Sequence, residues 1–162
     1  MRSVNYLLVG AMLVSPLGTR VVFSEEFDVC GIESAMAFDE WQEWRKLTPV
    51  PIRSREHIDW VIIYVDDLAR SSDLASTGAY AECAKVVKVH FSNARGTDIL
   101  RLMLMAKMAA GFDPDHGDWW YGMYDGKAGT SVIEEGAIAN CIVCHQRASD
   151  TDYIFASEVA RP

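Results

Sequence analysis

The feature that most constrains the fold is the segment Cys141-Ile-Val-Cys-His145, which lies only 17 residues before the end of a 162-residue sequence. Cys-x-x-Cys-His is the attachment signature of a c-type haem, in which the two thiols bond to the porphyrin and the histidine binds the iron. No Met or His follows His145, so any second axial ligand must come from upstream. The iron is therefore either ligated by an upstream side chain or open to a small molecule.

Two other uses of paired cysteines fit this sequence less well. A thioredoxin-like Cys-x-x-Cys motif lies within a βαβ pattern, and too little chain follows residue 145 to build the rest of such a sheet. A structural zinc site takes four ligands, and the two remaining cysteines, Cys30 and Cys83, are isolated from each other in the sequence. The motif thus predicts one covalently attached haem c, held by Cys141 and Cys144, with His145 as the axial iron ligand.

The N-terminus has the pattern of an export signal. Arg2 precedes a mostly apolar stretch of twelve residues from Tyr6 to Leu17, which is short for a membrane span and typical of a signal peptide. We expect residues 1–24 to be a signal peptide, with an uncleaved N-terminal anchor as the alternative because no clear cleavage pattern follows. Haem is attached to this motif outside the cytoplasm, so both features predict a periplasmic protein.

The composition predicts one folded domain, at residues 34–162. Half of all residues are hydrophobic (50%), enough for a sizeable core, and the net charge of -8 argues against a nucleic-acid partner because phosphates would be repelled. An oxidising compartment would allow a disulfide between Cys30 and Cys83, across 52 intervening residues. Two unrelated thiols are the alternative.

The residue pattern predicts an α+β fold. Residues 34–46 fit an amphipathic helix that ends at Thr48 and Pro49. Segments rich in β-branched and aromatic residues predict strands at 58–65, 84–91 and 118–125, whereas 99–109 fits either a helix or a strand. A C-terminal helix at about 134–148 would carry the haem motif. We therefore expect an antiparallel, strand-rich domain with flanking helices and a C-terminal haem-binding helix.

Side chains of the strand predicted at 84–91 should alternate between the two faces of a sheet. One set consists of Lys85, Val87, Val89 and Phe91, and the other of Val86, Lys88 and His90. The two lysines of this strand are therefore predicted to point in opposite directions.

Several short motifs occur in a specific order and spacing. They are Trp44-Arg-Lys-Leu-Thr-Pro49, Ile63-Tyr-Val-Asp66, Val86-Val-Lys-Val89, Gly111-Phe-Asp-Pro114, Asp118-Trp-Trp-Tyr-Gly122, the haem segment and Asp152-Tyr-Ile-Phe155. From roughly Trp41 to Phe155 the chain thereby resembles the cytochrome P-460 family and its cytochrome c′-beta relatives. The predicted strands argue against the four-helix cytochromes c′. The resemblance implies a sheet-based single-haem domain, often a homodimer, with a five-coordinate iron bound by His145.

The resemblance also implies two alternative roles for a lysine. In P-460 proteins a lysine side chain is bonded to the porphyrin edge and the protein oxidises hydroxylamine. In the c′-beta relatives that bond is absent, the distal side is apolar, and the protein binds nitric oxide. Lys88 lies in the segment that matches the lysine-bearing strand, Lys85 faces the other way, and Lys107 is a more distant candidate. The alternative for Lys88 is a solvated position on the outer face of the strand.

The open iron leads to three functional hypotheses. Oxidation of hydroxylamine would release protons and pass electrons to a redox partner protein, so a carboxylate such as Asp113 or Asp115 is expected near the iron. Binding of nitric oxide without catalysis would require only an apolar pocket. An electron carrier would need a sixth iron ligand, for which the candidates are Met103, Met105, Met108, His90 and His116.

Overall fold

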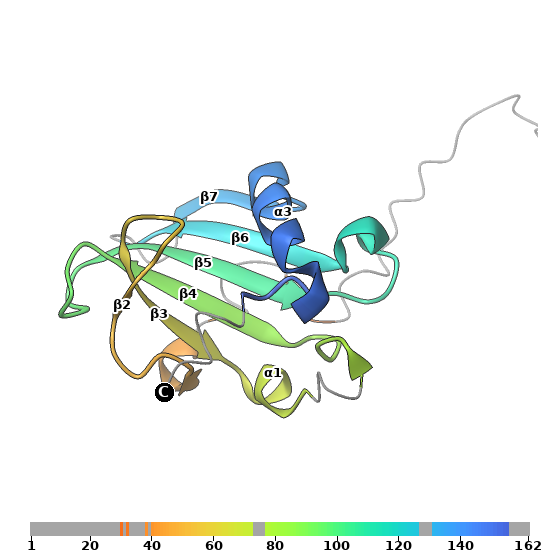
Figure 1. The fold of residues 1–162 in the computed structure, drawn as a ribbon, viewed down its shortest axis with the longest axis horizontal. Coiled ribbons are helices and arrows are strands. Elements are labelled where there is room, and N and C mark those ends of the chain that lie inside the picture. The colour runs from red at the N-terminus through yellow and green to blue at the C-terminus, as the bar shows by residue number, and fades with distance from the viewer. Residues whose placement is uncertain are drawn as a thin grey trace, which may run out of the picture.

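An antiparallel sheet forms the centre of the molecule (Figure 1). The computed structural model describes residues 30, 32, 38, 40–72, 77–126 and 131–155. Seven strands form the sheet in the order β1-β3-β4-β5-β6-β7, with β2 also paired to β3. The strands are β1 Arg45–Lys46, β2 Ile52–Arg53, β3 Trp60–Val65, β4 Lys85–Phe91, β5 Ile99–Lys107, β6 Trp119–Asp125 and β7 Ser131–Gly136.

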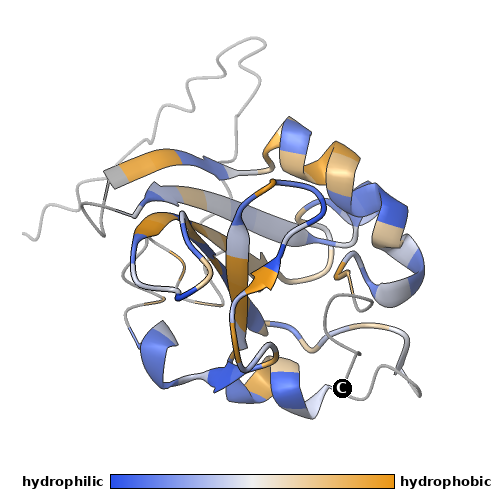
Figure 2. Ribbon diagram, turned by 60° about the vertical axis from the view of Figure 1, so that its left-hand side comes forward, coloured by the Kyte–Doolittle hydropathy of each residue, from blue (hydrophilic) through white to orange (hydrophobic). Residues whose placement is uncertain are grey.

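The described helices are short and lie around the sheet. They are the 3₁₀ helices η3 Trp41–Glu43, η4 Pro114–His116 and η5 Gln146–Thr151, and the α-helices α1 Asp67–Ser71 and α3 Ala139–His145. Helix α3 continues directly into η5, and hydrophobic residues in its middle give way to hydrophilic ones in η5 (Figure 2). Within the described part of the chain, none of the helices has the length and apolar character to cross a membrane. The predicted α+β class, with a strand-rich middle and a C-terminal helix, is confirmed.

The central strands lie where the sequence predicts them. Strands β3, β4 and β6 fall within the predicted ranges, and the ambiguous segment 99–109 contains strand β5. Strand β5 pairs with β4 on one side and with β6 on the other. A helix at this position would leave the facing backbone groups of both neighbours without hydrogen bonds, which is costly in a buried sheet. Pairing with the two neighbouring strands therefore explains why this segment is a strand, although its local sequence fits a helix equally well.

The sheet has two differently covered faces. On one face, Val87 and Val89 belong to a core cluster covered by Phe38, Trp41 and Trp44, and we call this the N-terminal face. The other face, which we call the α3 face, carries a second cluster that includes Ile63, Val86, Met105 and Tyr121 from the sheet and Ile138 and Ile142 from the helix. The alternation predicted for β4 is confirmed, because its two sets of side chains separate between these clusters.

The helix predicted at residues 34–46 is wrong where the structure describes it. Among the described residues of this range, only Phe38 and the three residues of η3 have a 3₁₀ conformation, and Arg45–Lys46 form strand β1, which pairs with the end of β3. The backbone turns extended at Trp44. Trp41 then packs edge-on against Tyr64, with ring centroids 4.9 Å apart, so the tryptophans cover the sheet without a regular helix.

The C-terminal helix begins later than predicted. Residues 131–136 form β7, which pairs with β6, and α3 starts at Ala139. Gly136 has a φ of 105°, a conformation that residues with side chains avoid, and it ends β7 before the helix. A short helix, α1, follows β3, and the Asp66 carboxylate caps it by accepting a hydrogen bond from the Ala69 N–H.

The predicted signal peptide or anchor, residues 1–24, lies outside the described residues. The structure does contain a disulfide between Cys30 and Cys83, with a sequence separation of 53. The Cys83 N–H donates a 2.7 Å hydrogen bond to the Lys107 carbonyl at the end of β5. The disulfide therefore attaches Cys30 to the sheet close to that strand end.

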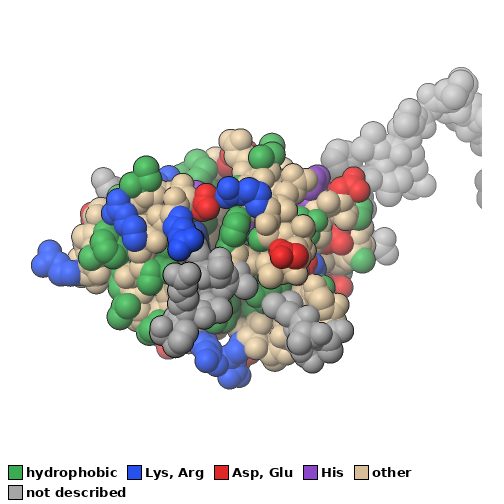
Figure 3. All heavy atoms as spheres, viewed as in Figure 1, with side chains coloured by type: hydrophobic (Ala, Val, Ile, Leu, Met, Phe, Trp, Pro, Cys, Tyr) green, Lys and Arg blue, Asp and Glu red, His purple; other side chains and the backbone are tan. Residues whose placement is uncertain are grey.

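Charged side chains are unevenly distributed on the surface. On the face shown in Figure 3, Lys and Arg lie mainly towards one side and Asp and Glu mainly towards the other. On this face, the two kinds of charge are therefore separated.

The disulfide should contribute to stability by restricting the unfolded chain. Replacing both cysteines in Cys30→Ala/Cys83→Ala should lower the free energy of unfolding by about 2–4 kcal/mol, measured by urea denaturation without reductant. Reductant should lower the stability of the native protein to the same level and leave the double variant unaffected. Equal stability of the oxidised protein and the variant would contradict this role.

Candidate functional site

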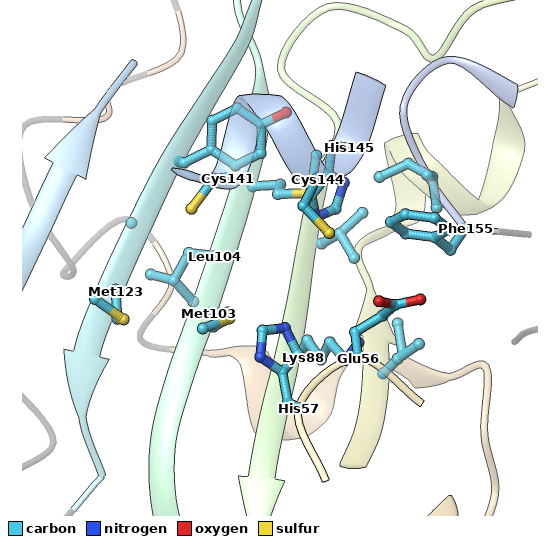
Figure 4. A pocket seen from close by; sticks show the side chains of 16 residues that line it. Glu56, His57, Lys88, Met103, Leu104, Met123, Cys141, Cys144, His145 and Phe155 are labelled. Carbon is cyan, nitrogen blue, oxygen red and sulfur yellow. The ribbon is translucent and has the colours of Figure 1, made fainter. Parts of the chain in front are cut away.

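A pocket lies between α3 and the α3 face of the sheet (Figure 4). Its empty space, which includes the part that is open to solvent, is about 740 Å³. Cys141, Cys144 and His145 form one end, which we call the helix end. Glu56 and His57, from the loop between β2 and β3, lie at the opposite end, which we call the loop end. The three residues of the haem motif thus face one common cavity.

The sheet supplies the floor of the pocket. Its register places Lys88 beside Ile63 and Met103, and Met103 beside Met123. All four side chains line the pocket, so the floor contains one cationic group among apolar ones. The position of Lys88 on this face follows from the strand alternation that the sequence predicts.

The imidazole of His145 is held by a backbone carbonyl. Its Nδ1 lies 2.6 Å from the carbonyl oxygen of Tyr153. A carbonyl can only accept, so Nδ1 carries the proton and Nε2 is the nitrogen with a lone pair for a metal. The rings of Tyr121 and Phe155 flank the imidazole with centroids 5.4 and 5.2 Å away. This is the arrangement of a metal-binding histidine whose other ring nitrogen is fixed by a hydrogen bond.

The two motif cysteines do not resemble a redox dithiol or a zinc site. They form no disulfide, and burial raises the pKa of the Cys141 thiol to about 11. A redox-active dithiol needs the opposite, a lowered pKa that yields a thiolate at neutral pH. Within the described residues, neither cysteine belongs to a group of three or more side chains that could hold a metal ion.

The residues present fit a haem. Tyr121 is buried, lines the pocket, and its hydroxyl has no hydrogen-bond partner among the described residues. A buried hydroxyl without a partner is costly, so a group that fills the pocket is its natural partner. Burial also raises the pKa of this phenol above its usual range, which keeps it a neutral donor. Cys141, Cys144 and His145 would hold the group at the helix end.

Of the three candidate lysines, only Lys88 lines the pocket. The ammonium group of Lys85 lies 5.8 Å from the ring centre of Phe38, on the N-terminal face, as its place in the strand predicts. The Lys107 ammonium instead makes an ion pair with the carboxylate of Asp152 at 2.7 Å. The structure therefore brings Lys88 together with the haem motif and places the other two elsewhere.

The two predicted proton acceptors are not among the pocket-lining residues. The carboxylate of Asp113 lies 2.8 Å from Nδ1 of His116 in the loop between β5 and β6, and Asp115 is exposed. The carboxylate that lines the pocket is Glu56, which the sequence did not reveal, together with His57. No motif marks these two residues, since their place depends on how the loop folds over the sheet.

The candidates for a sixth iron ligand are also separated. Met103 and Met105 line the pocket. Met108 belongs to the core of the N-terminal face, and His116 binds Asp113. His90 is fully buried beside the loop rather than in the pocket lining.

Two ion pairs hold the loop that forms the loop end. Glu56 pairs with Arg147, two residues after His145, at 2.9 Å, and this hydrogen bond lowers the pKa of the Glu56 carboxyl. Asp59 pairs with Arg101 of β5 at 2.7 Å. Although burial acts to raise it, hydrogen bonds from Arg101 and His90 hold the pKa of Asp59 below its usual range. The loop is thus fixed to the helical segment at one point and to the sheet at another.

A buried histidine supports the same loop. Nδ1 of His90 lies 3.3 Å from the Asp59 carboxylate, and the ring of His57 packs edge-on against it at 4.9 Å. Burial, together with the nearby charges of Lys88 and His57, lowers the pKa of His90 to about 3. A neutral His90 donates its Nδ1 proton to Asp59, and its Nε2 has no partner among the described atoms.

The family model for cytochrome P460 matches residues 38–156. This range contains the whole sheet, the pocket and the Cys-x-x-Cys-His motif, and it covers more than half of the chain. No curated protein matches the chain closely enough to transfer a role. The chain belongs to the cytochrome P460 family.

His90 should make the stability of the fold sensitive to acid. In the unfolded chain a histidine takes up its proton near pH 6.5, whereas folded His90 does so only near pH 3. Between these values the unfolded state binds more protons, so acidification favours unfolding. This group alone should remove on the order of 3 kcal/mol of stability between pH 7 and pH 4.

The variant His90→Gln should therefore lose less stability than the native protein over the same pH interval. Urea denaturation at pH 7 and pH 4 measures both losses, and circular dichroism at pH 7 checks that the variant is folded. An identical pH dependence of the two proteins would show that His90 does not titrate as described.

Proposed function

We propose that this member of the cytochrome P460 family is a periplasmic single-haem cytochrome that oxidises hydroxylamine. The observation that carries the proposal is the position of Lys88, which lines the same pocket as Cys141, Cys144 and His145. Lys88 is half-buried there, on a pocket floor that is otherwise apolar. The family includes hydroxylamine-oxidising proteins in which a lysine is bonded to the haem, and Lys88 is our candidate for such a bond because it lines the pocket.

The residues at the helix end of the pocket would hold the haem, and those at the loop end would accept protons. His145 would bind the iron through Nε2 while Cys141 and Cys144 hold the porphyrin, and Lys88 would bond to its edge. When bound, the haem supplies a Lewis-acidic iron that also accepts electrons. The sixth position of the iron would remain open to a small nitrogen ligand.

Oxidation of hydroxylamine removes protons as well as electrons, so the pocket needs a proton acceptor. Glu56 meets this requirement better than Asp113, because Glu56 lines the pocket. The hydrogen bond from Arg147 lowers the pKa of Glu56, which keeps the carboxylate ionised and able to accept. His57, beside it in the lining, would be the next group to receive a proton.

Binding of nitric oxide without catalysis is the second candidate function. It is favoured by the apolar floor, where Met103, Met105 and Met123 lie on the same face of the sheet as Lys88. A six-coordinate electron carrier is the third, and it would require Met103 or Met105 to bind the iron. The first two functions differ in whether Lys88 is bonded to the haem.

The proposed oxidation also requires partners. Electrons would leave to a redox partner protein, and the family resemblance implies a homodimer. The predicted signal peptide supports export to the periplasm, where haem is attached to Cys-x-x-Cys-His motifs.

The lysine bond can be tested by mass spectrometry of the haem-loaded protein. Proteolysis should yield haem bonded both to the Cys141–Cys144 peptide and to a peptide that contains Lys88. The variant Lys88→Met should carry haem on the cysteine peptide alone, and Lys85→Met should behave as the native protein does. Native protein with haem only on the cysteine peptide would exclude the bond and favour nitric oxide binding.

The proton acceptor can be tested by kinetics. Glu56→Gln should slow the hydroxylamine-dependent reduction of an electron acceptor by about 10²-fold, the usual effect of losing a general base. Glu56→Gln also removes the ion pair with Arg147. The variant Arg147→Met removes this ion pair but keeps the Glu56 carboxylate, so it shows how much of the loss comes from the ion pair alone. Asp113→Asn is the matched substitution of a carboxylate. A large loss of rate in Asp113→Asn with no loss in Glu56→Gln would identify Asp113, and not Glu56, as the proton acceptor.

A further inference from the structure

We infer that the buried ion pair between Lys107 and Asp152 positions the axial histidine. The pair lies outside the pocket lining. It acts through the chain turn at residues 152–153, whose Tyr153 carbonyl accepts the hydrogen bond from Nδ1 of His145. The inference rests on His145 as the iron ligand and not on the identity of the substrate.

The ion pair is short, bidentate and shielded from water. The Lys107 ammonium lies 2.7 and 2.9 Å from the two carboxylate oxygens of Asp152. The two side chains are only 12% and 6% exposed. Removing either partner would leave an uncompensated buried charge, so the pair holds its two segments firmly in one geometry.

Asp152 is held by two further elements. Its carboxylate accepts a 2.6 Å hydrogen bond from the Tyr80 N–H, and its carbonyl accepts one of 3.0 Å from the indole of Trp119 in β6. Lys107 ends β5 and is itself fixed to the loop before β4 through its backbone N–H and the Ala84 carbonyl, 2.9 Å apart. Asp152 therefore joins the C-terminal turn to the sheet through several independent contacts.

The turn has a conformation that needs such support. Asp152 and Tyr153 have φ values of 48° and 64°, in the left-handed region that side chains disfavour. Strained backbone persists where surrounding contacts over-determine it, and it is common where a functional group must be oriented. Here the strain has a visible result, because it directs the Tyr153 carbonyl at His145.

The position of this carbonyl matters for the iron. A hydrogen bond to the second ring nitrogen fixes the tautomer and orientation of a metal-binding histidine, and it makes the nitrogen that binds the metal more basic. A turn released from the sheet would let the carbonyl move away from Nδ1. The histidine would then donate less electron density to the iron.

The iron–histidine stretching band of the ferrous, haem-loaded protein reports this directly by resonance Raman spectroscopy. Asp152→Asn and Lys107→Met should shift the band to lower frequency. Lys107→Arg keeps the charge pair, so its band should stay at the native frequency. Asparagine has the size of aspartate and tolerates the left-handed conformation, so Asp152→Asn removes chiefly the charge. The double variant Lys107→Met/Asp152→Asn removes both charges at once and replaces the single variants if they do not load haem.

Val87→Ala is the matched control for lost stability. Val87 is fully buried on the N-terminal face, so its truncation weakens the fold without touching the turn, and the band should not move. An unshifted band in the charge variants, accompanied by lower stability, would overturn the positioning role and leave a structural one. A native protein without any iron–histidine band would instead refute a five-coordinate ferrous iron bound by His145.

Discussion

The packing of α3 across one face of the antiparallel sheet is the constraint on which the pocket depends. Ile138 and Ile142, one helical turn apart, are buried in the cluster of the α3 face. Burial of such side chains stabilises a fold by roughly 1.5–3 kcal/mol each, so the helix has a strongly preferred orientation. Cys141, Cys144 and His145 lie on the adjoining side of the same helix and therefore face the cavity.

The sequence alone predicts the parts of the site that depend on local rules. The haem motif identifies its own three residues, and the alternation along β4 places Lys88 on the α3 face and Lys85 on the other. The rest depends on contacts between distant segments. Glu56 reaches the pocket because its loop is tied down through Arg147 and Asp59, and no local pattern reveals such ties. Asp113 has the right chemistry, but its loop holds it against His116 instead.

The pocket combines features of the two kinds of P460 relative. Its floor of methionines is apolar, as expected for a protein that binds a diatomic gas, and its loop end carries Glu56 and His57, as expected for proton transfer. Lys88 lies between these environments, and its charge lowers the pKa values of Glu56 and His90. Loss of that charge through a bond to haem would therefore weaken the field that keeps Glu56 ionised, so the proposed bond would affect the proposed proton acceptor.

Strand β5 connects the two ends of the site. Arg101, Met103 and Lys107 have the same parity along the strand, so all three lie on the α3 face. Arg101 holds the loop through Asp59, Met103 forms the floor, and Lys107 holds the turn behind His145. A slip of one residue in the pairing of β5 would exchange these side chains for those of the N-terminal face. The register of one strand therefore sets the floor, the loop end and the support of the axial histidine together.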